Sequence, residues 1–345
     1  MKRMKGRGRI AVLAVAAATL LAACGGSSGG TTGGGASGSI SISGSSTVEP
    51  ISSAVAQKFS SFNPDVSLRV DGPGTGDGFA LFCDGNIDVA DASRPIKAEE
   101  VEICEENGVE FVELKVAIDG IAVLTSPEND AVDCLTFADL YALLGPESEG
   151  FDSWADASEL AQELGGTNDF PDVPLVVTAP GEESGTYDSF VELVLEEIAV
   201  DERGQPEDGP FVRPDYQASP NDNVIIEGIT GNPTSLGWVG YAFYVNNQET
   251  VKALEVDNGE TGCVGPTQEA IQSAEYPISR FLYIYVNAEK AEQNDALQAY
   301  IDFYLSDDGI VSAEEVGYVG LHDDDLQATR QAWEDREIGT RDGGE

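Results

Sequence analysis

The feature that most constrains the fold of this 345-residue chain is a loop rich in Ser, Thr and Gly that leads into a helix, because it occurs three times. Alternating apolar residues predict strands over 39–44 and 66–70, directly before the first two loops. The three loops and their predicted helices are 44–50 before a helix from Ile51, 71–78 before 79–83, and 180–186 before 187–198. Strands that alternate with helices are typical of α/β folds.

Each of these loops brings hydrogen-bond donors to a helix start. The free N–H groups and the positive dipole end of a helix N-terminus favour anions, and Ser and Thr add hydroxyl donors. The alternative is that the hydroxyls only cap their helices; in the first loop, Ser46 or Thr47 is the expected N-cap, with Pro50 in the first turn. Because the arrangement occurs three times, we favour a shared anion site.

The glycine run 72–78 does not match a nucleotide-binding loop. No Lys follows it, as a P-loop requires, and the Gly-x-Gly-x-x-Gly spacing is absent. We expect a tight turn that presents N–H groups and the Thr75 hydroxyl to a small anion.

A short buried strand is predicted over 87–92, and Ser93 and Arg94 follow it. In open α/β sheets, ligands bind outside the carboxyl ends of strands. The planar guanidinium of Arg94 suits bidentate contact with a tetrahedral oxyanion. The alternative is a surface ion pair between Arg94 and a neighbouring acid.

Residues 1–23 resemble a cleaved export signal, with five bases before a short apolar run that cannot span a bilayer. The segment ends in Leu-Ala-Ala before Cys24, which resembles a bacterial lipobox, so Cys24 is the expected lipidation site. The alternative is a soluble secreted protein with an unmodified cysteine. Residues 24–39 are almost entirely Gly, Ser, Thr and Ala, which predicts a flexible tether.

Four further cysteines are expected to form disulfides, since export implies an oxidising compartment. Four cysteines allow three pairings, and we favour Cys83–Cys104 and Cys134–Cys263. Zinc is the competing interpretation, but no Cys-x-x-Cys pair occurs and the only histidine, His322, is distant in sequence.

The charge balance excludes some partners. The chain has 62 acids and 18 bases, for a net charge of −44, and five of the bases lie in the predicted signal. Nucleic acid and anionic lipid are poor partners for such a surface. An anion must therefore bind through local dipoles and a buried cation.

An ordered set of motifs resembles the phosphate-binding protein of the ABC phosphate importer, the PstS family, over essentially the whole mature chain. These motifs are Gly-Ser-Ser-Thr-Val-Glu-Pro (44–50), Gly-Pro-Gly-Thr-Gly (72–76), Asp-Val-Ala-Asp-Ala-Ser-Arg (88–94), Ser-Gly-Thr (184–186), Asn-Asp-Asn (221–223), 235–244 and 276–281.

The resemblance implies a type II periplasmic-binding-protein-like fold, with two α/β lobes and a phosphate cleft between them. Lobe one is then 40–124 plus 277–345, and lobe two is 125–276. The residues that match the family's phosphate ligands are Ser46, Thr47, Val48, Thr75, Ser93, Ser184, Gly185 and Thr186.

Two positions depart from the family's pattern. The arginine that many members carry before Ser-Gly-Thr is missing here, so we assign the cation to Arg94. The aspartate often found near Ser93 is not clearly placed, and Asp88 and Asp91 are the candidates.

The expected function is therefore extracytoplasmic capture of inorganic phosphate and delivery to the importer's membrane permease. We expect a monomer anchored to the outer face of the cell membrane at Cys24, without cofactor or metal. The alternatives are a binder of sulfate or molybdate, and a secreted phosphatase. We do not expect an enzyme, because Ser184 does not fit the Gly-x-Ser-x-Gly elbow and a single histidine makes a Ser-His-Asp triad improbable.

Overall fold

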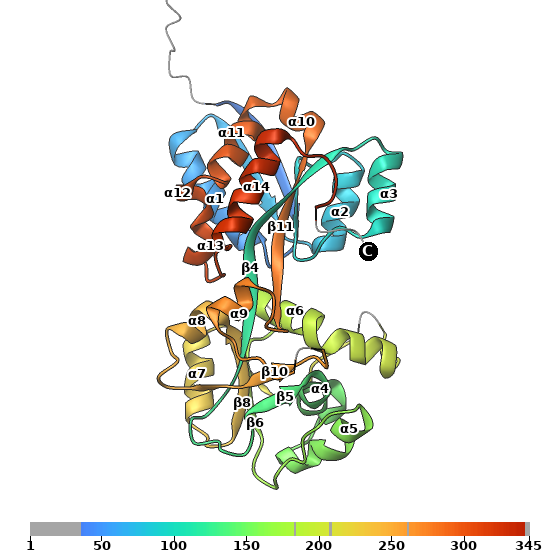
Figure 1. Ribbon diagram of the computed structural model, residues 1–345, viewed down its shortest axis with the longest axis vertical. Helices are drawn as coiled ribbons and strands as arrows, with labels where there is room; N and C mark the ends of the chain where they lie inside the picture. The colour runs from blue at the N-terminus through green and yellow to red at the C-terminus, as the bar shows by residue number, and fades with distance from the viewer. Residues whose placement is uncertain (1–35, 183, 207–208, 261, 342–345) are drawn as a thin grey trace, which may run out of the picture. The chain divides into compact units, whose positions relative to one another are not determined.

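The computed structural model describes residues 36–182, 184–206, 209–260 and 262–341 (Figure 1). The predicted signal 1–23, the lipidation site Cys24 and most of the predicted tether lie outside the described residues. The first strand begins at Gly38, two residues before the expected start of the fold.

The strands form one large sheet and one short pair. They are β1 (Gly38–Gly44), β2 (Val66–Asp71), β3 (Val89–Ala92), β4 (Phe111–Thr125), β5 (Cys134–Thr136), β6 (Val176–Ala179), β7 (Gln217–Ala218), β8 (Ser235–Gly240), β9 (Lys252–Ala253), β10 (Glu255–Asp257) and β11 (Ser279–Asn287). The large sheet has the order β2-β1-β3-β11-β4-β8-β6-β7, with β9 beside β4, while β5 pairs with β10.

Helices separate most of these strands along the chain. The α-helices are α1 (Glu49–Phe62), α2 (Thr75–Cys83), α3 (Ala98–Glu106), α4 (Phe137–Leu144), α5 (Ser158–Glu163), α6 (Gly185–Phe190), α7 (Asp222–Thr230), α8 (Tyr241–Val245), α9 (Gln268–Gln272), α10 (Ala288–Gln293), α11 (Asp295–Tyr304), α12 (Asp307–Ile310), α13 (Ser312–Glu315) and α14 (Asp323–Asp335). Two 3₁₀ turns, η1 (Pro146–Ser148) and η2 (Trp154–Ala157), and two π-helical segments, η3 (Val191–Leu195) and η4 (Ile198–Glu202), complete the set.

The large sheet consists of two parallel groups joined by an antiparallel pair of long strands. β1 is parallel to β2 and β3, and β6 is parallel to β7 and β8. Between these groups, β11 pairs antiparallel with β3 and β4, and the far part of β4 pairs with β8. Figure 1 shows β4 and β11 running side by side from the end that carries α1–α3 and α10–α14 to the end that carries α4–α9.

Apolar runs at 118–124 and 281–286 predict these two connecting strands, and the structure confirms both. The architecture is the expected two-lobed α/β fold. Because β4 belongs to both groups, the exact lobe boundaries at 124 and 277 stay a prediction.

Each end of the molecule is packed around a hydrophobic cluster of its own. One packs α1 and α11 on the β1 end of the sheet, where Phe59 and Tyr300 meet edge to face with ring centroids 5.5 Å apart. The other surrounds β8, where Phe190 of α6 stacks on Trp238 at 4.3 Å. This stack fixes the helix that follows the Ser-Gly-Thr loop.

Two local predictions are wrong. The second helix starts at Thr75 instead of Phe79, because the glycines at 76 and 78 form its first turn. A Cβ at Gly78 would lie 2.5 Å from Gly44 Cα, so this glycine permits close packing of α2 on β1. Neither Ser46 nor Thr47 caps α1; Val48 precedes that helix without a side-chain cap, and Ser45 Oγ instead accepts from Thr47 N at 3.2 Å.

Both predicted disulfides are confirmed. Cys83–Cys104 joins the end of α2 to α3, and Cys134–Cys263 closes a much longer loop. The separations are 21 and 129 residues, for which chain entropy gives about 3 and about 5 kcal/mol of stabilisation respectively.

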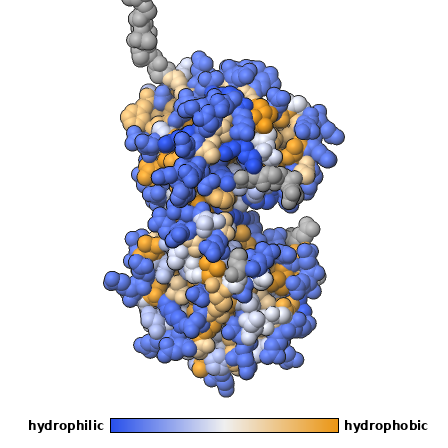
Figure 2. Space-filling model, in the orientation of Figure 1, coloured by the Kyte–Doolittle hydropathy of each residue, from blue (hydrophilic) through white to orange (hydrophobic). Residues whose placement is uncertain are grey.

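The visible face of the molecule is predominantly hydrophilic (Figure 2), in keeping with the acidic composition. In the part of the chain that the structure covers, no helix has the length and apolar content needed to cross a bilayer.

Candidate anion-binding site

Two hydroxyls meet at the ends of β3 and the loop before α2. Thr75 Oγ1 lies 3.0 Å from Ser93 Oγ, and the Ser93 N–H donates to Thr75 Oγ1 at 3.3 Å. Thr75 is the first residue of α2, and Ser93 follows β3 directly. The structure therefore brings together two of the predicted ligand residues.

A second group of hydroxyls lies between the loop after β1 and α6. Ser46 Oγ donates to Asp188 Oδ2 at 2.9 Å, and Thr47 Oγ1 lies 3.2 Å from Ser189 Oγ. Because neither hydroxyl caps α1, both are available to reach the helix opposite. The N–H of Val48 donates to Ser45 O at 3.2 Å.

The Ser-Gly-Thr loop stands directly against this segment. Ser184 caps α6 by accepting from Thr186 N at 3.2 Å. A Cβ on Gly185 would lie 3.5 Å from Thr47 Cα, so the two predicted motifs are in close contact.

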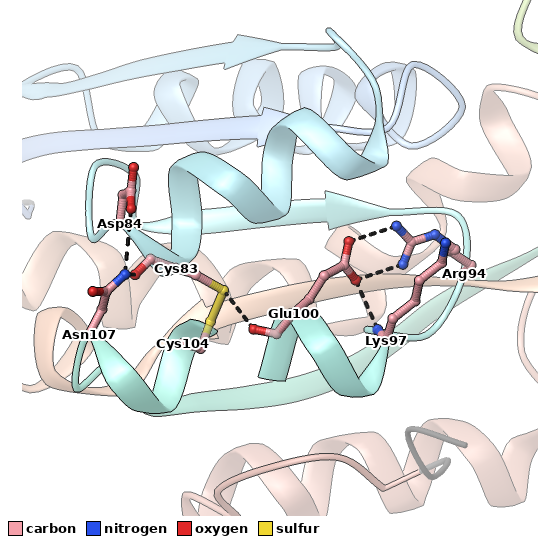
Figure 3. The surroundings of a disulfide bond; sticks show 7 residues. All are labelled: Cys83, Asp84, Arg94, Lys97, Glu100, Cys104 and Asn107. Carbon is pink, nitrogen blue, oxygen red and sulfur yellow. Dashed lines mark hydrogen bonds and ion pairs between the residues drawn. A yellow bond between two sulfur atoms is a disulfide. The ribbon is translucent and has the colours of Figure 1, made fainter. Parts of the chain in front are cut away.

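Arg94 has an established partner in its own half of the molecule. Its two terminal nitrogens each donate to one carboxylate oxygen of Glu100 at 2.8 Å (Figure 3). Burial acts to lower the pKa of Arg94, but the hydrogen bonds and charge of Glu100 outweigh it, so the net shift is upward. Glu100 also accepts from Lys97 N and belongs to α3, which the disulfide Cys83–Cys104 ties to α2. The guanidinium nitrogens of Arg94, which were expected to contact an oxyanion ligand, donate to a carboxylate of the protein.

A second arginine, which the sequence analysis did not single out, lies on the connecting strands. Arg280 of β11 stands opposite Asp119 of β4 in the antiparallel register. Its Nε is 3.9 Å from Asp119 Oδ2, and in the described residues neither atom has a hydrogen-bond partner. Its terminal nitrogens donate to Ser189 Oγ at 2.8 Å and to Glu192 of η3.

Arg280 therefore reaches the second group of hydroxyls, because Ser189 also contacts Thr47. Burial raises the pKa of Asp119, while the charge of Arg280 and a hydrogen bond from Ser189 act in the opposite direction. Burial also raises the pKa of Asp188, against the hydrogen bond from Ser46.

A cavity of about 660 Å³ lies beside these groups. It is lined by Thr75, Ser93, Arg94, Arg280 and Glu192, with nine further residues. In Figure 2 the surface is hollowed at the level where the two ends of the molecule meet. Two arginines and two of the predicted hydroxyls line the cavity, whereas Ser46, Thr47, Val48 and the loop 184–186 do not line it.

The two candidate aspartates near Ser93 have structural partners. Asp88 accepts from the N–H and the hydroxyl of Ser41 at 2.8 and 2.9 Å, and Asp91 accepts from Ser52 Oγ at 2.9 Å. Neither contributes to the lining of the cavity.

Metal-ligating side chains are not clustered in the described part of the chain. No cluster of three or more His, Cys, Asp or Glu side chains with metal-binding geometry occurs there. His322 caps α14 through its Nδ1, which accepts from Asp324 N at 3.3 Å.

These features define a class of protein: a two-lobed α/β solute-binding protein whose lobes share two long strands and enclose an anion-binding cleft. The sequence matches the PBP superfamily domain over residues 29–308. It is 38% identical over 311 residues to Protein SphX of Synechocystis, covering 90% of this chain and 86% of that protein. It is 32% identical over 286 residues to the phosphate-binding protein PstS of Staphylococcus saprophyticus, covering 82% and 81%.

A solved structure described as a possible phosphate-binding protein from Planctomyces limnophilus matches with a TM-score of 0.77 and 34% identity, covering 88% of this chain and 99% of that one. The chain belongs to the PBP superfamily and, within it, to the PstS family of phosphate-binding proteins.

Proposed function

We propose that this chain binds inorganic phosphate in the cleft and delivers it to the permease of an ABC importer. The observation that carries the proposal is the cavity itself, which combines two arginines with the hydroxyl of Thr75 at the start of α2 and that of Ser93 after β3. The relatives named as phosphate-binding proteins support phosphate as the anion.

The proposed ligand set keeps the residues expected from the sequence. Hydroxyl and N–H groups come from Ser46, Thr47, Val48, Thr75, Ser93 and 184–186, and Arg94 supplies positive charge together with Arg280. In the structure these groups contact one another or nearby carboxylates. Binding therefore requires the hydroxyls of Ser46 and Thr47 to exchange their contacts with Asp188 and Ser189 for contacts with phosphate.

The proposed location is the outer face of the cell membrane, with a monomer held by a lipid at Cys24. The two disulfides support an oxidising compartment. Mass spectrometry of the exported protein tests the anchor: a mature N-terminus at Cys24 carrying acyl chains is expected, and an unmodified Cys24 contradicts it.

The proposed role is binding without catalysis. Isothermal titration of the delipidated protein with phosphate, arsenate, sulfate and molybdate tests it, with phosphate expected to saturate at one equivalent and to bind most tightly. Tighter binding of sulfate or molybdate would mean that this anion, and not phosphate, is the ligand. Release of phosphate from phosphate esters would contradict the binding role.

A further inference from the structure

Glu192 is the cavity residue whose position is hardest to reconcile with an anion site. Glu192 lines the cavity that we propose to bind phosphate, and its carboxylate adds negative charge there. It contacts Arg280, which belongs to a different element of the fold. A carboxylate is planar and a phosphate is tetrahedral, but both are oxyanions that accept hydrogen bonds from the same guanidinium nitrogens.

The partners of Arg280 differ in how firmly they are held. Asp119 is fixed on β4 with its side chain 6% exposed, and Ser189 is buried. The side chain of Glu192 is 46% exposed and comes from the π-helical segment η3, so it can turn into solvent at little cost. Arg280 itself is 12% exposed and stays in place on β11.

We infer that Glu192 occupies the anion's place at Arg280 in the unliganded protein, and that phosphate binds by displacing it. The inference rests on the proposed function, and it makes Arg280 the principal cation of the site. Glu192 then acts as a built-in competitor that weakens phosphate binding.

The electrostatics of the neighbouring acids agree with this exchange. Burial is the main cause that raises the pKa of Asp119 and of Asp188, and the charge of Glu192 raises both further. Three carboxyl groups therefore share one arginine. When Glu192 turns outward, its charge moves into water, where its repulsion of an incoming anion is screened.

Arg94 differs from Arg280 in how firmly its carboxylate partner is held. Its carboxylate partner Glu100 has a side chain only 16% exposed and also accepts from Lys97 N at the start of α3. Displacing Glu100 would break the start of that helix, whereas displacing Glu192 leaves the fold intact.

The test is a phosphate titration of the full-length mature protein and of two matched variants, E192Q and E196Q. Glu196 lines the same cavity one helical turn beyond Glu192, so both variants remove one negative charge from one wall. We expect E192Q to tighten phosphate binding about fivefold, the worth of a partly exposed ion pair, and E196Q to change it by less than about twofold.

A third variant, R280Q, completes the cycle. In the R280Q background, E192Q should no longer tighten binding by more than E196Q does, because the contact for which phosphate competes is gone. Thermal unfolding of each variant, checked by circular dichroism, shows that the fold is retained.

Equal gains in E192Q and E196Q would overturn the inference, since they would show general repulsion only. Weaker binding in E192Q would also overturn it, because Glu192 would then support the ligand. Either result leaves the proposed function standing if the wild type binds phosphate. A wild type that binds none of the four oxyanions would overturn the proposed function and this inference together.

Discussion

The end of β3 and the connecting strands each carry one buried aspartate and one arginine, but they use them in opposite ways. At the end of β3, the two are separated: Asp91 faces Ser52, and Arg94 turns away to Glu100. On the connecting strands, Asp119 and Arg280 stand directly opposite each other. The same residue types therefore give a bidentate ion pair with one carboxylate in one region, and in the other an arginine shared among several partners.

The difference shows that an arginine near a strand end is not by itself an anion site. The nitrogens of Arg94 are already matched by a carboxylate of the same lobe. Those of Arg280 are shared by a serine, by a buried aspartate 3.9 Å away and by a half-exposed glutamate. Four predictions test this comparison.

The largest expected effect concerns the isolated aspartate of the β3 region. Burial raises the pKa of Asp91 to about 7, partly offset by the hydrogen bond from Ser52. The native state thus holds a proton that an unfolded aspartate, with a pKa of about 3.9, releases earlier. This contribution to stability is fully present below about pH 4 and is lost as the pH rises through 7, about 4 kcal/mol in all.

The variant Asp91→Asn removes this loss of stability with rising pH, because asparagine does not ionise. Relative to wild type, its free energy of unfolding in urea should rise by about 4 kcal/mol between pH 4 and pH 8. The exposed Asp201 provides the control, because D201N should run parallel to wild type. Parallel curves for wild type and D91N would mean that Asp91 is ionised in the native protein.

The second prediction compares the two arginines directly. Loss of a buried charged partner costs 2–5 kcal/mol or more in binding, so Arg280→Gln should lower phosphate affinity about 100-fold. Arg94→Gln should lower it by less than about tenfold, because Glu100 already engages both terminal nitrogens. Arg280→Lys should recover only part of the loss, since an ammonium lacks the planar fork. Calorimetry decides, and a greater loss in R94Q would restore the assignment of the cation to Arg94 alone.

The sequence predicted much of the fold around this site but not the pair Asp119 and Arg280. The strands over 118–124 and 281–286 and both disulfides are confirmed, while the shared ligand set stays a prediction. These features depend on local periodicity, composition and spacing. The start of α2 was missed because glycines that usually indicate a turn serve here for close helix–strand packing.

Arg280 was missed for a different reason. It stands opposite Asp119 only because of the register between β4 and β11, and their pairing is not visible in either strand alone. A signal did exist for Asp119, which lies inside the apolar run 118–124, whereas Arg280 stands just before the run 281–286. The partner of Arg94 was equally hidden, because Glu100 is six residues away across a turn, which is not a helical spacing.

A third prediction sharpens the contrast between the two carboxylates. Glu100→Gln weakens the pair with Arg94 at a partly exposed site and should lower the free energy of unfolding by about 1 kcal/mol. It should leave phosphate affinity within about twofold, unlike E192Q, since Arg94 remains bound to its own lobe. Urea unfolding and calorimetry measure the two effects. A clear gain of affinity in E100Q would mean that Arg94 is also a cation for which a carboxylate competes.

The smallest expected effect concerns salt, and it separates a buried site from a surface one. The chain carries 62 acids against 18 bases, so its long-range field repels phosphate. Ions screen that field over a Debye length of about 10 Å at 0.1 M, while contacts at the largely buried Arg280 are screened much less. Raising the sodium chloride concentration should therefore leave the association rate of phosphate unchanged or increase it a few-fold. Binding at an exposed basic surface would instead slow steeply with salt. Stopped-flow association of phosphate across a salt series distinguishes the buried site from the surface site. Because E192Q removes one repelling charge at the cavity, its association rate should respond less to salt than that of the wild type.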